Sequence, residues 1–236
     1  MSTASAPDYA AAGARWLLGA TAHPGGRALT EHLLDRLALP TGALVADVAC
    51  GSGATLDVLA DRGLLGVGVD IERRALARAG GVAVVGDAHA LPLATGAYDA
   101  ALCECAVSTF TDPERAVAEL ARVVRPGGQV AMTDVVLRRD LAPAPVVDAV
   151  DRLTTARTLP QYSALLERAG LRVVRIEDRS ADALALCRRL ARRLRPISPQ
   201  HAATARACAQ AVEAGALSYG LLVAQVLPSS AGRPSR

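Results

Sequence analysis

The chain has 236 residues, of which 51% are hydrophobic and 21% charged, and its net charge of +3 is too small to indicate a polyanionic partner. Its five cysteines show neither a disulfide framework nor a zinc-type CxxC pair, and its 26 basic residues are all arginine, which excludes a lysine Schiff base and a P-loop lysine. No apolar run approaches the ~18 residues of a membrane helix and the N-terminus lacks signal-peptide order, so we expect a cytoplasmic protein with no membrane partner.

Residues 1–40 predict an N-terminal helical cap. A helix is expected over 9–18, and leucines at helical spacing predict a second over 28–37, after a turn at His23-Pro24-Gly25-Gly26. Aromatic residues are scarce in this chain, and two of them, Tyr9 and Trp16, lie in this cap. We favour packing of the cap as their role over contact with a bound cation. The main domain then covers 41–228, and a Ser-, Gly-, Pro- and Arg-rich disordered tail covers 229–236.

From residue 43 short apolar runs alternate with helical stretches. Seven strands are predicted at Ala43–Ala49, Gly66–Val69, Val82–Val85, Ala100–Cys105, Val130–Val136, Leu171–Ile176 and Leu221–Val226. The helical stretches lie near 54–62, 72–79, 113–124, 146–169 and 181–215, and the last is long enough for two helices. This alternation predicts an α/β fold with a doubly wound, mostly parallel sheet covered on both faces.

The segment 181–215 begins with a helix that carries arginines on one face and apolar residues on the other. A nucleic-acid contact is one interpretation of such a face. We favour a solvated amphipathic face, because stacking aromatics are absent there and the whole chain is near neutral. No nucleic-acid partner is therefore expected.

A glycine turn follows the first strand. Asp47 lies near the end of the strand, Gly51 and Gly53 form the turn, and a helix begins near Ala54. Glycines let a ligand approach the backbone, and free amides at the start of a helix can bind a carboxylate or phosphate. An acid at Asp47 repels a pyrophosphate and can hold an ammonium group.

Two further acids end the next two strands. Asp70 closes Gly66-Val67-Gly68-Val69-Asp70, and Asp87 follows the third strand after Gly86. At that edge of an open α/β sheet, Asp70 is suited to accept hydrogen bonds from ribose hydroxyls. Asp87 is suited to accept one from an adenine amine.

These segments resemble the class I S-adenosylmethionine-dependent methyltransferase family over about residues 41–137. "DVACGSG", "GVGVD" and "GDAHALPL" are similar to its first three motifs, and "YDAALCECAVSTF" and "ELARVVRPGGQVAMTD" to the later ones. The resemblance implies a seven-stranded Rossmann-like sheet with an antiparallel last strand, a catalytic domain over 41–228, and S-adenosyl-L-methionine as cofactor. Carried over, the cofactor contacts fall on Asp47, Ala49, Cys50, Gly51, Gly53, Asp70, Ile71, Asp87, Ala88 and Cys103. Ala49 departs from the family, which commonly has glycine there.

Two rival interpretations were weighed against this one. A nicotinamide-binding domain needs a third glycine where this chain has Leu56. A protein that binds S-adenosylmethionine without catalysis remains an alternative.

The resemblance predicts methyl transfer to a small molecule, whose identity the sequence does not give. Because the methyl group arrives activated, a base is needed only for a protonated nucleophile, and His89, Glu104 and Ser108 are weak candidates. Strand alternation places Cys103 and Cys105 on one face, so an arsenite methyltransferase-like enzyme that holds a metalloid on these two thiols is an alternative. We favour two buried cysteines acting as small hydrophobes, and no metal site is expected.

Overall fold

The computed structural model describes residues 23–227. The chain forms α2 (Gly26–Leu37), β1 (Leu44–Val48), α3 (Ala54–Asp61), β2 (Leu65–Asp70), α4 (Arg73–Leu76), β3 (Val82–Val85), β4 (Tyr98–Glu104), a 3₁₀ turn η1 (Val107–Thr109), α5 (Pro113–Val123), β5 (Val124–Leu137), α6 (Ala144–Asp151), α7 (Leu159–Arg168), β6 (Leu171–Asp178), α8 (Ser180–Leu194), α9 (Pro199–Glu213) and β7 (Leu217–Val226). The predicted helix over 9–18, Tyr9, Trp16 and the tail over 229–236 lie outside the described residues. None of the helices within 23–227 is long and apolar enough to cross a membrane.

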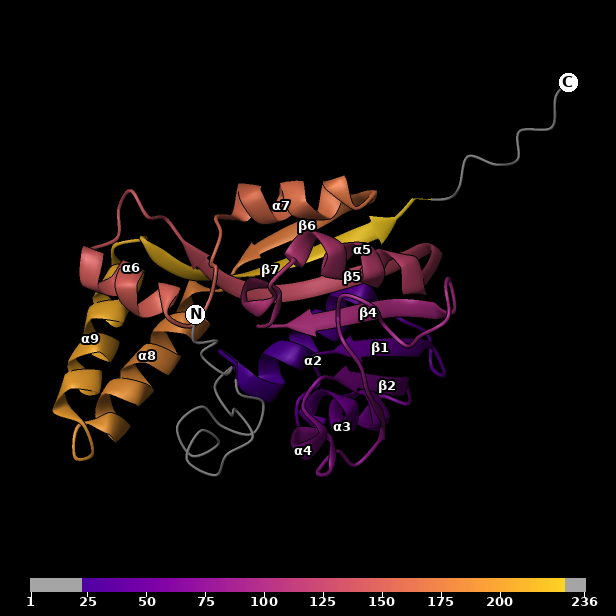
Figure 1. Cartoon of the computed structure of the whole chain (residues 1–236), viewed down its shortest axis with the longest axis horizontal. Helices are drawn as coiled ribbons and strands as arrows, with labels where there is room; N and C mark the ends of the chain where they lie inside the picture. The colour runs from indigo at the N-terminus through magenta and orange to yellow at the C-terminus, as the bar shows by residue number, and fades with distance from the viewer. Residues whose placement is uncertain (1–22, 228–236) are drawn as a thin grey trace, which may run out of the picture.

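The sheet has seven strands in the order β3-β2-β1-β4-β5-β7-β6 (Figure 1). Strands β1 to β5 pair in parallel, whereas β7 runs antiparallel to both β5 and β6. The predicted doubly wound sheet with an antiparallel last strand is therefore confirmed. In such a sheet the carboxyl ends of the parallel strands gather at one edge, which is where ligands bind.

Two apolar layers cover the sheet. Helices α2, α3, α6, α8 and α9 supply buried residues to one layer, and α5 and α7 supply them to the other. Side chains of β1 and β4 alternate between the layers: Val45 and Leu102 belong to the first, and Ala46 and Cys103 to the second. This alternation assigns Asp47 and Glu104 to the face that α2 and α3 cover.

Glycines in β2 let α3 lie close to the sheet. A Cβ atom at Gly66 would lie 2.9 Å from Leu59 Cδ1, and one at Gly68 would lie 2.7 Å from Cys50 Sγ. Leu56 packs into the same space and is 3% exposed. The close packing fixes the start of α3, and with it the glycine turn, against β2.

Three predicted elements differ from the structure. The helix predicted over 146–169 is two helices, because Thr158 caps a new helix through a capping box and Pro160 occupies its first turn. The helix predicted over 72–79 is shortened to the four residues of α4. The fourth strand ends at Glu104, since Cys105 has a left-handed φ of +57°. The two helices predicted within 181–215 are confirmed as α8 and α9.

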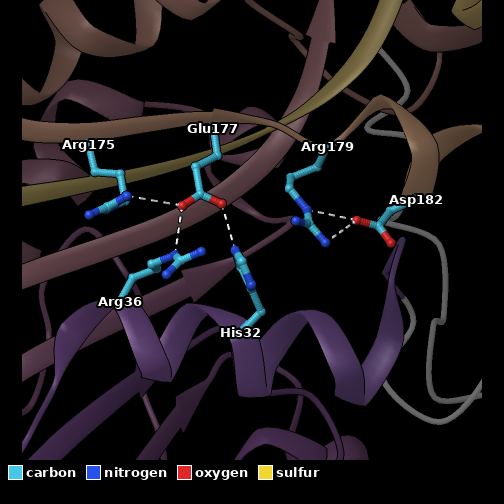
Figure 2. Close-up of polar contacts among 6 residues, drawn as sticks. All are labelled: His32, Arg36, Arg175, Glu177, Arg179 and Asp182. Atoms are coloured by element: carbon cyan, nitrogen blue, oxygen red, sulfur yellow. Dashed lines mark hydrogen bonds and ion pairs between the residues drawn. The ribbon is translucent and has the colours of Figure 1, made fainter.

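A cluster of charged side chains ties α2 to the edge strand β6 (Figure 2). Glu177 Oε2 lies 2.6 Å from His32 Nε2, and its Oε1 accepts hydrogen bonds from Arg36 Nε at 2.8 Å and from Arg175 Nη1 at 3.5 Å. Burial alone would raise the pKa of Glu177, but the hydrogen bond from His32 and the charge of Arg36 overcome it, so the pKa is lowered. The carboxylate thus stays ionised and holds α2 in place.

Candidate functional site

The glycine turn after β1 has a left-handed backbone at three positions. Ala49, Gly51 and Gly53 have φ of +62°, +54° and +79°. A Cβ atom at Gly51 would meet no atom within 4 Å, whereas one at Gly53 would lie 2.9 Å from Ala79 Cβ. Gly53 is therefore required by packing within the protein. Packing does not require glycine at Gly51, which leaves open space beside the backbone.

Replacing Ala49 with glycine is expected to stabilise the protein. A side chain in the left-handed region costs about 1–2 kcal/mol, and the greater freedom of glycine in the unfolded chain removes part of that gain. We expect the free energy of unfolding in urea to rise by about 0.5–1 kcal/mol. The matched variant Ala60→Gly lies on the exposed side of α3, and its free energy of unfolding should fall by about the same amount. Equal destabilisation by both variants would contradict the strain at Ala49.

Asp70 joins the end of β2 to the glycine turn. Its Oδ2 accepts a hydrogen bond from the Gly51 amide at 2.8 Å, and its Oδ1 accepts one from the Glu72 amide at 2.8 Å. Each carboxylate oxygen keeps a second lone pair for another donor. The next residue, Ile71, is an isolated apolar side chain that is 67% exposed. The pair therefore offers a hydrogen-bond acceptor and an apolar surface beside the turn.

Two buried carboxylates lie behind the turn. Asp47 is 2% exposed and its Oδ2 has no hydrogen-bond partner among the described residues. Burial, together with the charges of Glu104 and Asp70, raises the pKa of Asp47 well above its ordinary range. An unpaired buried carboxylate is costly, so a cation held here would lower the free energy of the site.

Glu104 receives hydrogen bonds from both helices that cover this face. Thr30 of α2 donates to its Oε1 at 3.0 Å, and Thr55 of α3 donates to the same oxygen at 3.0 Å. His23 Nε2 lies 3.7 Å from Glu104 Oε2, and the two side chains are only 4% and 5% exposed. We call His23, Thr30, Thr55 and Glu104 the Glu104 cluster. Sequence reasoning named Glu104 but not the threonines. A threonine within the leucine stripe of α2 was the signal for Thr30.

The third predicted acid lies at a more exposed position. Asp87 Oδ1 accepts hydrogen bonds from the amide and from Nδ1 of His89, at 2.9 and 2.6 Å. His89 Nε2 in turn accepts one from the Asp112 amide at 3.2 Å. Both ring nitrogens of His89 are therefore engaged in joining two loops. Ala88 is buried in the apolar layer beneath.

Ser108 is a buried residue bound to a second carboxylate. Its amide and hydroxyl donate to the two oxygens of Asp134 at 2.8 and 2.6 Å, and its carbonyl accepts from the Thr155 amide at 2.6 Å. Burial raises the pKa of Asp134 to about 6, even though these hydrogen bonds oppose the shift. Ser108 thus anchors the loop after β4 to β5, and its hydroxyl points at Asp134.

The two thiols at the end of β4 do not form a common site. Cys103 is fully buried in the layer under α5, whereas Cys105 packs in the layer that contains Tyr219. The left-handed backbone at Cys105 ends the strand alternation, which is why the prediction of a shared face was wrong. Burial raises the pKa of the Cys105 thiol to about 12, and that of Cys103 is raised as well. Within 23–227, no three His, Cys, Asp or Glu side chains gather as metal ligands.

Comparison with known proteins decides the family. Residues 46–132 match the model of a methyltransferase domain. An uncharacterized methyltransferase of Synechocystis is 31% identical over 171 residues, which are 66% of this chain and 80% of that protein. The chain belongs to the class I S-adenosylmethionine-dependent methyltransferase family.

Other relatives match smaller shares of their own length. Methyltransferase GfsG of Streptomyces halstedii is 34% identical over 65% of this methyltransferase and 61% of the relative. The mouse tRNA (carboxymethyluridine(34)-5-O)-methyltransferase ALKBH8 is 39% identical over 39% of this chain and 14% of its own. The solved phosphoethanolamine N-methyltransferase 2 of Haemonchus contortus has a TM-score of 0.79 at 17% identity, with 91% of this chain and 56% of that one covered. That likeness concerns the fold.

The residues around the glycine turn fit S-adenosylmethionine. Gly51 leaves room beside the backbone, and Oδ2 of Asp47, which has no hydrogen-bond partner among the described residues, belongs to a buried carboxyl group that a cationic ligand would help to ionise. Asp70 and Ile71 offer an acceptor and an apolar face at the same turn. A dinucleotide fits poorly, because Asp47 opposes a pyrophosphate and the position of the third glycine is filled by buried Leu56.

Proposed function

We propose that this methyltransferase transfers a methyl group from S-adenosylmethionine to a small-molecule acceptor. The observation that carries the proposal is the buried carboxyl group of Asp47, whose Oδ2 has no hydrogen-bond partner within 23–227, behind a turn where Gly51 leaves open space. When bound, the sulfonium supplies a methyl group that is already activated. The protein's own task is then to bind, align and exclude water.

The named residues divide this task. Asp70 accepts hydrogen bonds from the ribose hydroxyls, Ile71 covers one face of the adenine, and Asp87 and the backbone at Ala88 lie at its edge. The amides of the turn, from Ala49 to Gly53, hold the amino-acid end, and Cys50 supports the turn by packing on Gly68. Cys103 supports the site from beneath, because it packs in the buried apolar layer.

A small-molecule acceptor is supported by the shape of the chain around the site. The segments next to the carboxyl ends of β4 and β5 are the short turn η1 and the helices α6, α8 and α9. In Figure 1 these helices lie at that end of the sheet. The arginines of α8 are partly engaged with its neighbours, as in the ion pair between Arg188 and Glu213 of α9 at 2.6 Å. This favours a covered acceptor site over a long basic groove.

Isothermal titration of the purified chain with S-adenosylmethionine and S-adenosylhomocysteine tests the proposal. We expect saturable binding of both at micromolar concentration and no binding of NAD. Formation of S-adenosylhomocysteine on incubation with a panel of phenols, thiols and amines then separates an enzyme from a silent binder. Absence of cofactor binding would refute the proposed function.

A further inference from the structure

His23 lies in the Glu104 cluster with one ring nitrogen bound and the other unbound. Its Nδ1 is 2.8 Å from the Pro24 carbonyl oxygen, which can only accept a hydrogen bond. Nδ1 therefore carries the proton in the neutral ring, and Nε2 carries a lone pair. Nε2 is buried and has no hydrogen-bond partner among the described residues.

The lone pair of Nε2 faces another acceptor. Glu104 Oε2 is 3.7 Å away, which is beyond hydrogen-bond distance. Both threonine hydroxyls of the cluster donate to Glu104: Thr55 to Oε1 at 3.0 Å, and Thr30 between Oε1 at 3.0 Å and Oε2 at 3.2 Å. In the neutral ring, the lone pair of Nε2 is buried beside a carboxylate without a donor of its own, and a donor hydrogen delivered by a ligand would satisfy it.

The turn that carries His23 packs against α8. A Cβ atom at Gly25 would lie 3.1 Å from Asp182 Cγ, and Asp182 forms an ion pair with Arg179 at 2.8 Å (Figure 2). The next residues enter α2, which Glu177 ties to β6. The turn that carries the imidazole thus lies against α8 and leads into a helix that is tied to β6.

We propose that His23 Nε2 and Glu104 form the proton-accepting site for a methyl acceptor whose nucleophile is an O–H group that arrives protonated. This inference rests on the proposed function. As the acceptor oxygen bonds to the methyl carbon, the carbon–sulfur bond breaks and its electron pair stays on sulfur. The O–H proton passes to Nε2 of His23, and Glu104 balances the charge of the resulting imidazolium.

Two probes of similar shape but different ionisation test the inference. At about pH 8 phenol is protonated, whereas thiophenol is largely ionised and needs no base. We expect His23→Gln to lower kcat/KM for methylation of phenol by about 100-fold or more, and that of thiophenol by less than about fivefold. The matched variant His201→Gln, on exposed α9, should change neither. Equal losses for both probes, or no loss, would overturn the inference.

Two measurements keep the test independent of turnover. Titration with S-adenosylhomocysteine should give His23→Gln and the wild type affinities within about threefold, since the pair serves the acceptor. A tenfold loss would assign the pair to the cofactor and overturn the inference. In the wild type, ¹⁵N NMR of the histidines should show His23 protonated at Nδ1 and not at Nε2, and the opposite tautomer would also overturn it.

The remaining outcomes separate this inference from the proposed function. A wild-type protein that binds S-adenosylhomocysteine but methylates neither probe would refute the O–H acceptor and leave the proposed function standing. A wild-type protein that does not bind S-adenosylhomocysteine would refute the proposed function itself. Glu104→Gln should lower the rate with phenol selectively, as His23→Gln does.

Discussion

Replacing Asp70 with alanine is expected to weaken the binding of S-adenosylmethionine by about 30- to 150-fold, which is about 2–3 kcal/mol. The carboxylate is the acceptor that the ribose hydroxyls would meet, and hydrogen bonds to charged groups are the stronger kind. It also accepts the Gly51 amide at 2.8 Å, so its loss releases the turn that holds the amino-acid end of the ligand. The dissociation constant from isothermal titration measures the effect.

The control for this variant is Asp148→Asn, at an exposed position of α6 far along the chain from the turn. It should bind the cofactor as the wild type does. Asp70→Asn should fall between the two, because an amide keeps one acceptor oxygen but turns a donor toward a backbone amide. Unchanged affinity in Asp70→Ala would remove Asp70 from the cofactor site.

The contribution of Asp134 to stability is expected to fall as the pH rises from about 4 to about 7. Burial raises the pKa of Asp134 to about 6 in the native state, whereas an unfolded aspartate titrates near 4. Between these values the native protein keeps a proton that the unfolded chain has released. Deprotonation therefore costs the native state up to about 3 kcal/mol of stability by neutral pH. The raised pKa of Asp47 acts in the same direction.

Urea unfolding at a series of pH values isolates the share of Asp134. Asp134→Asn should be less stable than the wild type, because its amide faces donors from Ser108, but its stability should depend much less on pH. Ser108→Ala removes one hydrogen-bond donor to the carboxylate, which should raise the pKa of Asp134 further. The decline of stability should therefore extend to higher pH. Parallel curves for the wild type and Asp134→Asn would show that Asp134 does not carry the effect.

The seven strands and the acids at the ends of the first three could be predicted from the sequence because both follow local rules. Apolar runs of strand length before Asp47, Asp70 and Asp87 placed all three at one sheet edge, and the structure brings the first two to the glycine turn. The break at Thr158 was missed because a short helix that ends without glycine resembles a continued one.

Contacts between distant residues were beyond sequence reasoning. Nothing local indicates that Thr30 and Thr55 donate to one oxygen of Glu104, or that His23 approaches the same carboxylate. The prediction that Cys103 and Cys105 share a face was wrong because of one backbone dihedral angle. Cys105 follows β4 with a left-handed φ, which turns its thiol to the opposite layer. The role of His89 likewise depended on Asp112, a residue 23 positions away.

The insertion of α8 and α9 between β6 and β7 has a consequence for how this scaffold can diversify. The helical pair joins β6 to β7, whereas the glycine turn follows β1 and Ile71 follows β2, with β4 and β5 lying between the two pairs of strands. Replacement of this helical pair at its two junctions would change its contact with the turn at Gly25 and leave the packing of Cys50 and Leu56 on Gly68 unchanged. We therefore expect a chimeric protein with a different helical pair at this place to keep the packing that holds the glycine turn against β2.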